Sequence, residues 1–221
     1  MNALLLGAAA AVPPPRWGGN NGTLAWSAFV NMTDISDSPL HPRWQFEYRY
    51  DWRLQSDRYD HAKGQHDEVC KWALPSSIGS SCTVLNVGGN VSTTYIMSGD
   101  TCCACRAPWM PFTIRSDWLQ DGGASYVGVA SVDGQPADEW LKQGASDNHY
   151  YATRNAAQAP IRYMEHKHGM LKQWDFIEYD ASPPDPASLE APAGCEAACE
   201  SKLCGGKAQP RTAGVAAPTA E

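Results

Sequence analysis

The chain has 221 residues, with 17 basic against 24 acidic side chains and a formal net charge of −7. Because the charge is acidic and the basic residues are scattered, the composition excludes a nucleic-acid surface and a polybasic membrane patch. The length fits one large β domain with tails.

The two ends of the chain differ from its middle. Residues 1–12 combine an apolar run with small residues, which predicts a signal peptide cleaved between residues 9 and 12. Three prolines then open an extended lead-in over 13–23, and a single β domain is expected over 24–204. Residues 205–221 are mostly Gly, Ala, Pro and Thr, which predicts a disordered tail without a membrane anchor.

Sequons and cysteines indicate the secretory pathway. Asn21, Asn31 and Asn90 each begin an Asn-x-Ser/Thr sequon and are candidate glycosylation sites. Eight cysteines are many for a reduced compartment. We therefore expect a secreted or lumenal, disulfide-bonded glycoprotein.

Strand patterns follow one another with little helical periodicity. In chain order we expect strands at 24–31, 44–52, 58–62, 69–74, 82–87 and 91–97. The Cys-rich segment 101–108 is expected to interrupt the run, and 116–119 to form one helical turn. Strands resume at 124–132, 137–143, 149–153, 161–165 and 171–179, with an Asp133-Gly134 hairpin turn after the first. The fold class predicted is an all-β antiparallel meander, closed into a barrel, stacked as two sheets or curled into a half-barrel.

The most regular pattern is an alternation of aromatic and polar residues from Arg43 to Trp52. Successive strand side chains point to opposite faces, so the rings of this segment share one face. That row consists of Trp44, Phe46, Tyr48, Tyr50 and Trp52.

Two interpretations of this row stay open. The rings would form an ordinary core, because large aromatic side chains contribute much buried area. Alternatively they would line a ligand pocket, because buried Tyr and Trp polar groups need partners that a ligand could supply. Other rings would extend such a lining, namely Trp26, Trp72, Trp140 and Trp174.

The cysteines also allow two interpretations. Cys102, Cys103 and Cys105 could hold zinc or copper with His166 and His168, although a solvated turn is the simpler interpretation of the two histidines. In an oxidising compartment disulfides are favoured over metal. Cys195 and Cys199 are natural partners for two of the three, Cys70 with Cys82 would close a hairpin, and Cys204 completes the set.

Short motifs from Trp118 onward suggest a family. They are Trp118-Leu119, Tyr126-Val127-Gly128, Val132-Asp133-Gly134, Trp140, Tyr150-Tyr151-Ala152-Thr153, Pro160-Ile161-Arg162-Tyr163, Trp174-Asp175-Phe176, and Pro192 followed by Cys195. In these the chain resembles ependymin-related proteins and uncharacterised plant and algal secreted proteins of that kind. The resemblance implies a half-barrel, similar to that of bacterial lipoprotein carriers, whose hydrophobic interior takes up lipid-like molecules. The family also includes calcium-responsive extracellular glycoproteins, so the resemblance allows calcium as a ligand. This chain has no dense acidic loop to bind it, because its candidate ligands are dispersed, namely Asp34, Asp37, Asp133 and Asp138.

No catalytic constellation emerges from the sequence. Gly-x-Ser-x-Gly is absent, and Glu47 and Asp51 would lie ~13 Å apart along a strand, beyond a glycosidase pair. We expect no catalytic residue, no metal and no cofactor. The predicted function is binding of an apolar or amphipathic small molecule on the aromatic face. The alternatives are an extracellular enzyme acting on carbohydrate or lipid, or a structural, adhesive matrix protein. A homodimer through a sheet edge is compatible with each.

Overall fold

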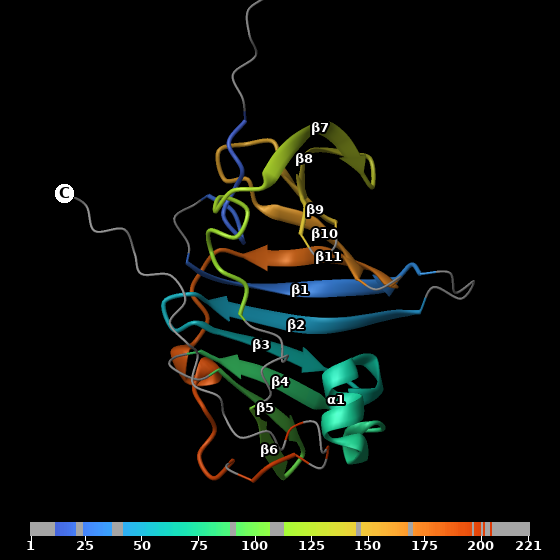
Figure 1. Ribbon diagram of the computed structural model, residues 1–221, viewed down its shortest axis with the longest axis vertical. Coiled ribbons are helices and arrows are strands. Elements are labelled where there is room, and N and C mark those ends of the chain that lie inside the picture. The colour runs from blue at the N-terminus through green and yellow to red at the C-terminus, as the bar shows by residue number, and fades with distance from the viewer. Residues whose placement is uncertain are drawn as a thin grey trace, which may run out of the picture.

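One antiparallel sheet of eleven strands organises the computed structural model (Figure 1). The structure describes residues 12–20, 24–36, 42–88, 92–106, 113–144, 147–167, 170–195, 197–199, 201 and 204. The predicted signal peptide to residue 11, the sequons at Asn21 and Asn90, His168 and the tail beyond 204 lie outside this part. The strands are β1 (Ala25–Asp34), β2 (Arg43–Asp51), β3 (Ser56–His61), β4 (Cys82–Val87), β5 (Thr93–Ser98), β6 (Thr101–Cys105), β7 (Ala124–Val132), β8 (Gln135–Lys142), β9 (Asn148–Thr153), β10 (Pro160–Lys167) and β11 (Met170–Asp180).

Two meanders join to make the sheet. The strand order is β6-β5-β4-β3-β2-β1-β11-β10-β9-β8-β7, so consecutive strands are neighbours except where β1 pairs with β11. The sheet curls without closing into a barrel (Figure 1). This confirms the predicted all-β, curled antiparallel fold. The Asp133-Gly134 turn is also confirmed, and both residues have the positive φ that the tightest hairpin turn requires.

Two local predictions were wrong. Residues 69–74 are not a strand but helix α1 (Glu68–Ala73), because Asp67 caps it by accepting from the Cys70 N–H at 2.9 Å and Pro75 follows its end. The short 3-10 helices η1 (Gly64–His66) and η2 (Pro75–Ser77) flank it. Segment 101–108 does not interrupt the sheet, since Thr101–Cys105 pairs with β5 as β6. Residues 116–119 lie in a longer run of turns that ends before β7, and the Asp121 N–H donates to the Asp117 carbonyl at 2.8 Å, as in the single helical turn that was predicted.

The two faces of the sheet differ in chemistry. On β2, Phe46, Tyr48 and Tyr50 are buried on one face, which we call the inner face, while Glu47 and Arg49 on the outer face form a surface ion pair. Two clusters cover the inner face. One gathers the aromatic residues, and the other packs α1 against β4, β5 and β6.

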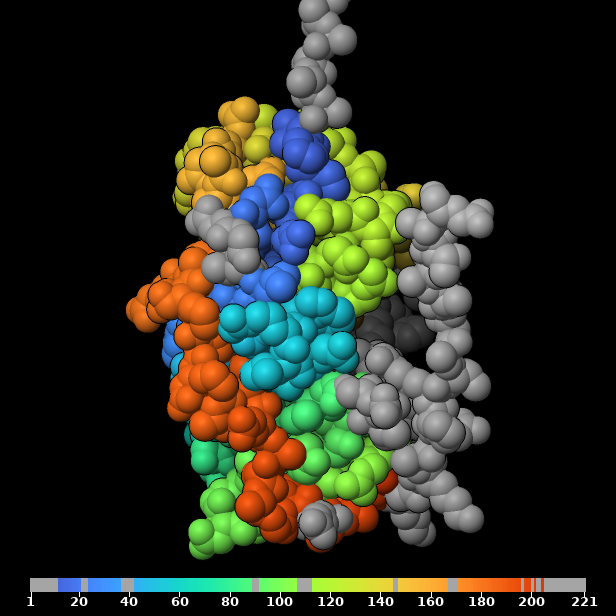
Figure 2. All heavy atoms as spheres, turned by 90° about the vertical axis from the view of Figure 1, so that its left-hand side faces the viewer, coloured from blue at the N-terminus to red at the C-terminus, as the bar shows by residue number. Residues whose placement is uncertain are grey.

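A C-terminal strap, residues 181–204, runs from the end of β11 to the sheet edge at β6 (Figures 1 and 2). The 3-10 helix η3 (Pro186–Leu189) lies over β2 and β3, where the Ser188 carbonyl accepts from Arg58. Further along, Ala198 bridges Ala104 on β6 and the Ala197 carbonyl accepts from the Ala104 N–H. The strap therefore covers one of the two sheet edges, as edge strands require.

All eight cysteines form disulfides. Cys70–Cys82 joins α1 to β4, and three bridges hold the strap to β6, namely Cys102–Cys195, Cys103–Cys199 and Cys105–Cys204. The predicted hairpin bridge and the predicted partners of Cys195 and Cys199 are confirmed. Four disulfides fit an oxidising compartment. None of the described helices is long and apolar enough to span a membrane.

Candidate functional site

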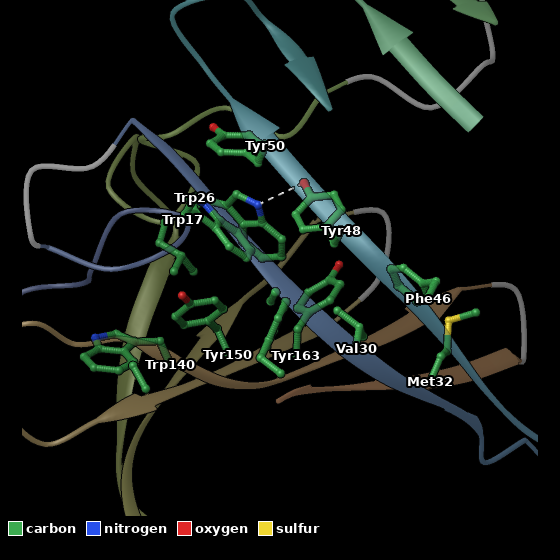
Figure 3. Packing of buried hydrophobic residues seen from close by; sticks show 14 residues of the cluster. Trp17, Trp26, Val30, Met32, Phe46, Tyr48, Tyr50, Trp140, Tyr150 and Tyr163 are labelled. Atoms are coloured by element: carbon green, nitrogen blue, oxygen red, sulfur yellow. Dashed lines mark hydrogen bonds between the residues drawn. The ribbon is translucent and has the colours of Figure 1, made fainter. Parts of the chain in front are cut away.

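The aromatic row lies in a packed cluster on the inner face (Figure 3). Trp26, Phe46, Tyr48, Tyr50 and Trp140 are fully buried, whereas Trp44, Trp52 and Trp174 are half-buried against the same cluster. The rings touch one another, with centroids 5.1 Å apart for Trp26 and Tyr48 and 5.4 Å for Phe46 and Trp174. Trp72 lies apart, on α1 beside the second cluster. The predicted ring residues other than Trp72 therefore share one face, and the fully buried ones fill it rather than border a void.

Trp17 completes this cluster and was not among the predicted residues. It precedes the first strand, is fully buried, and contacts five other rings, with centroids 5.4 to 6.1 Å away. Gly18 follows at φ +89°, where a Cβ would overlap the Trp26 ring. A lone Trp beside two glycines was the available signal, since glycine permits such close approach.

Two irregular segments, residues 12–20 and 113–123, cover the aromatic cluster; we call them the cover. They lie side by side at one end of the molecule (Figure 2), and the Trp17 N–H donates to the Ser116 carbonyl at 2.8 Å. Trp118 and Leu119 of the second segment pack on the cluster. No second sheet closes this part of the inner face among the described residues, so the rings are separated from solvent by chain without regular secondary structure.

Several polar atoms inside the cluster have no protein partner. Within the part of the chain that the structure describes, four indole N–H groups are buried without an acceptor, namely those of Trp26, Trp44, Trp140 and Trp174. A buried donor left unpaired costs roughly 1–3 kcal/mol. All four belong to the set predicted to bind a ligand, and an acceptor on a bound molecule would satisfy such groups.

A buried carboxylate lies next to the rings. Asp57 on β3 is fully buried and accepts hydrogen bonds from the hydroxyls of Tyr48 (3.3 Å) and Tyr59 (3.2 Å) and from the Asn86 amide (2.8 Å). Burial raises its pKa to about 6, and these hydrogen bonds only partly offset that rise. Asp57 was missed because the strand was predicted to begin at residue 58; its spacing of two from Tyr59 is the signal that places both on one face.

Two hollows lie near these residues. A cavity of about 260 Å³ is bounded by Trp52, Gln55, Asn86, Thr113 and Arg115 among others. A larger groove of about 760 Å³ lies on the outer face, lined mainly by polar side chains that include Asn31, Arg43, Gln45, Arg162, Gln173 and Asp175. Of the predicted ring residues, Trp44 borders the groove and Trp52 borders the cavity.

The remaining candidate residues named from the sequence form no further binding site among the described residues. His166 lies exposed on β10, and the described residues contain no group of three or more His, Cys, Asp or Glu arranged to hold a metal. Arg162 pairs with Asp175 across β10 and β11. The described sequon residue, Asn31, lies half-buried on central strand β1 and accepts from the Gln45 amide at 2.7 Å.

Comparison with known proteins gives fold likeness only. No protein-family model matches the chain, and no curated protein matches it in sequence, so membership of the ependymin-related family stays an expectation. Among solved structures it is similar to an uncharacterized conserved protein from Thermus thermophilus, at 12% identity and TM-score 0.46 over 78% of this chain and 88% of that one. It is also similar to lipoprotein LppX from Mycobacterium tuberculosis, at 10% identity and TM-score 0.41 over 74% of this chain and 90% of that one. A LolA superfamily protein from Nitrosomonas europaea is similar at 7% identity and TM-score 0.39, over 76% of this chain and 90% of that one. At these identities and TM-scores the likeness carries no function.

Proposed function

We propose that this chain is a secreted binding protein that takes an apolar or amphipathic small molecule onto the aromatic inner face. The observation that carries the proposal is the cover: two irregular segments close off the aromatic cluster, while buried indole N–H groups of the same cluster have no acceptor among the described residues. Burial of an apolar chain against such rings is favourable by about 25 cal/mol per Å².

Because the rings are packed, binding requires the cover to move. Segments without regular secondary structure open at lower free energy than the strands of a sheet. A ligand chain would then replace Trp17 as the neighbour of Tyr48 and Tyr150, and Trp118 as the neighbour of Tyr163. No residue needs to perform chemistry in this function.

Protein produced through a eukaryotic secretory pathway and analysed by native mass spectrometry tests this function. We expect adducts with the masses of lipid-like molecules, and uptake of a fluorescent fatty-chain probe after these are extracted. Protein that carries no adduct and takes up no probe would contradict the proposal.

A durable structural module is the second candidate. The packing of the rings favours it, since Trp26, Tyr48, Tyr50 and Trp140 are as buried as core residues. The same experiment separates the two functions, because a structural module neither carries an adduct nor takes up the probe.

A further inference from the structure

Asp57 differs from the other buried acids of this chain. Asp51 and Asp138 are also buried, but each has an arginine, Arg53 at 2.6 Å and Arg154 at 3.2 Å. Asp57 is the most buried of the three, and within the described residues it forms no ion pair. A buried carboxylate in a protein is normally paired with a cation. Asp57 has no such cationic partner among the described residues.

The groups around Asp57 suit a cation from outside the protein. Its described hydrogen-bond partners, Tyr48, Tyr59 and Asn86, are neutral. The two phenol rings lie with centroids 4.9 Å apart, and the Trp174 ring is 6.1 Å from that of Tyr59. The faces of aromatic rings attract organic cations, most strongly where water is excluded. A carboxylate among such rings is the arrangement that recognises an amine or a quaternary ammonium group.

The 260 Å³ cavity adjoins Asp57 through one of the residues that line it. Asn86 lines this cavity and donates a hydrogen bond from its amide directly to Asp57 at 2.8 Å. The Thr113 hydroxyl, also in the lining, donates to the Gln55 carbonyl at 3.0 Å. Trp52 forms part of the wall. The cavity is smaller than the 300–1,000 Å³ typical of whole-ligand pockets, so it suits a headgroup rather than a chain.

The charges at the cavity favour a cation over an anion. Arg115 is the cation in the lining, and it is already engaged by Asp117 at 2.7 Å and approached by Asp121 at 3.8 Å. An anionic headgroup in this cavity would be repelled by the negative charge of Asp57. Arg115 would not offset that repulsion, because its own charge is already paired with Asp117. Such opposed like charges disfavour binding.

We propose that Asp57 is the anchor for the cationic headgroup of an amphipathic ligand, an alkyl chain that carries an amine or a quaternary ammonium. This inference rests on the proposed binding function and specifies its ligand class. The chain would lie on the rings of the aromatic cluster, and the headgroup would pair with Asp57 from the side of the cavity that Asn86 lines.

Three probes of equal chain length test the anchor, namely dodecyltrimethylammonium, dodecanol and dodecanoate, each below its micelle concentration. Their dissociation constants are measured at neutral pH for the native protein, for Asp57→Asn and for Asp60→Asn. Asp60 is the matched control, because it lies on the same strand but on the outer face, where it pairs with Arg49 and Arg58. Circular dichroism establishes that each variant is folded.

The anchor predicts that the native protein binds the ammonium probe roughly 10-fold or more tightly than the alcohol, and the carboxylate most weakly. Asp57→Asn should remove this preference while leaving dodecanol affinity unchanged, and Asp60→Asn should keep it. Equal affinity for the three probes in the native protein, or an ammonium preference that survives Asp57→Asn, would overturn the anchor while the binding function stands. If no probe binds, both the anchor and the binding function are wrong.

Discussion

The indole N–H of Trp17 donates to the hydroxyl of Tyr48 at 3.4 Å (Figure 3), and that hydroxyl donates in turn to Asp57 at 3.3 Å. Trp17 belongs to the cover and Tyr48 to the middle of the aromatic row. One phenol thus connects the segment that closes the inner face with the carboxylate beneath it. Opening of the cover at Trp17 would remove the hydrogen bond that the Tyr48 hydroxyl accepts.

Replacing the covering ring should loosen the cluster. Trp17→Ala removes a fully buried indole and is expected to lower the free energy of unfolding by about 3–5 kcal/mol, the range for a large aromatic truncated in a core. The vacated space should also increase binding of an apolar dye to the folded protein. Denaturant unfolding and dye titration measure the two effects.

Trp17→Phe is the matched control, since it keeps a ring but removes the N–H that Tyr48 accepts. It should cost only about 1 kcal/mol beyond the loss of ring size, as for a single neutral hydrogen bond. If Trp17→Ala left both stability and dye binding unchanged, Trp17 would not be the residue by which the cover closes the aromatic cluster.

Asp57 should make stability depend on pH in the direction opposite to an ordinary salt-bridged acid. Its pKa of about 6 in the folded protein lies above the usual 3.8, so between these values the folded state holds a proton that the unfolded chain has released. The free energy of unfolding should therefore fall by about 3 kcal/mol as pH rises from about 3 to about 7. Tyr48, Tyr50 and Tyr59 face this region, and burial raises the pKa of each, so they stay protonated throughout.

Unfolding free energies of the native protein and of Asp57→Asn over this pH range isolate the effect as a difference. Asp60→Asn should change the pH profile in the other direction, because hydrogen bonds and charges from Arg58 outweigh burial and lower the pKa of Asp60. Identical profiles for the native protein and Asp57→Asn would show that Asp57 does not titrate abnormally.

The strap bridges should protect the β6 edge. Replacing all six cysteines of the three bridges by Ala opens loops of 93 to 99 residues, which should cost at least about 4–5 kcal/mol, and exposes β6 to pairing with another molecule. Light scattering should then show association that grows with concentration. Cys70→Ala with Cys82→Ala is the comparison: it opens a loop of 12 residues and leaves the strap in place, so we expect a loss of about 3 kcal/mol without added association.

Of the three sequons, Asn31 is the one that the structure places. Its side chain lies half-buried on β1, between the partner strands β2 and β11, whereas glycan acceptors are typical of surface loops. We therefore expect secreted protein to carry no glycan at Asn31. Glycopeptide mapping checks this site directly, and a glycan found there would show that the outer groove is occupied by sugar.

Much of the sheet follows from local pattern in the sequence. The alternation over 43–52 predicts which side chains share a face, and the Asp133-Gly134 turn predicts the β7–β8 hairpin, because both depend on residues close in the chain. The pairing of β1 with β11 could not be predicted in the same way. It joins residues about 150 positions apart, such as Ser27 and Asp180, and no local periodicity encodes it.

The site was harder to predict than the fold. Trp17 has no periodic neighbours, since its segment forms no strand, and its burial depends on where the cover lies in space. Asp57 has a charged side chain, for which an exposed position is the ordinary expectation. Its burial follows from the register of β3 against β2 and β4, where it lies opposite Tyr50 and Asn86.

Contact between a ligand chain and the inner-face rings is the central claim, and fluorescence quenching tests it most directly. A dodecyl probe brominated along its chain quenches tryptophans that it touches, and the unbrominated probe is its control. We predict that both bind with equal affinity, that only the brominated probe quenches, and that replacing Trp26 by Phe lowers the quenching. Binding without quenching would place the chain away from the rings and contradict the account.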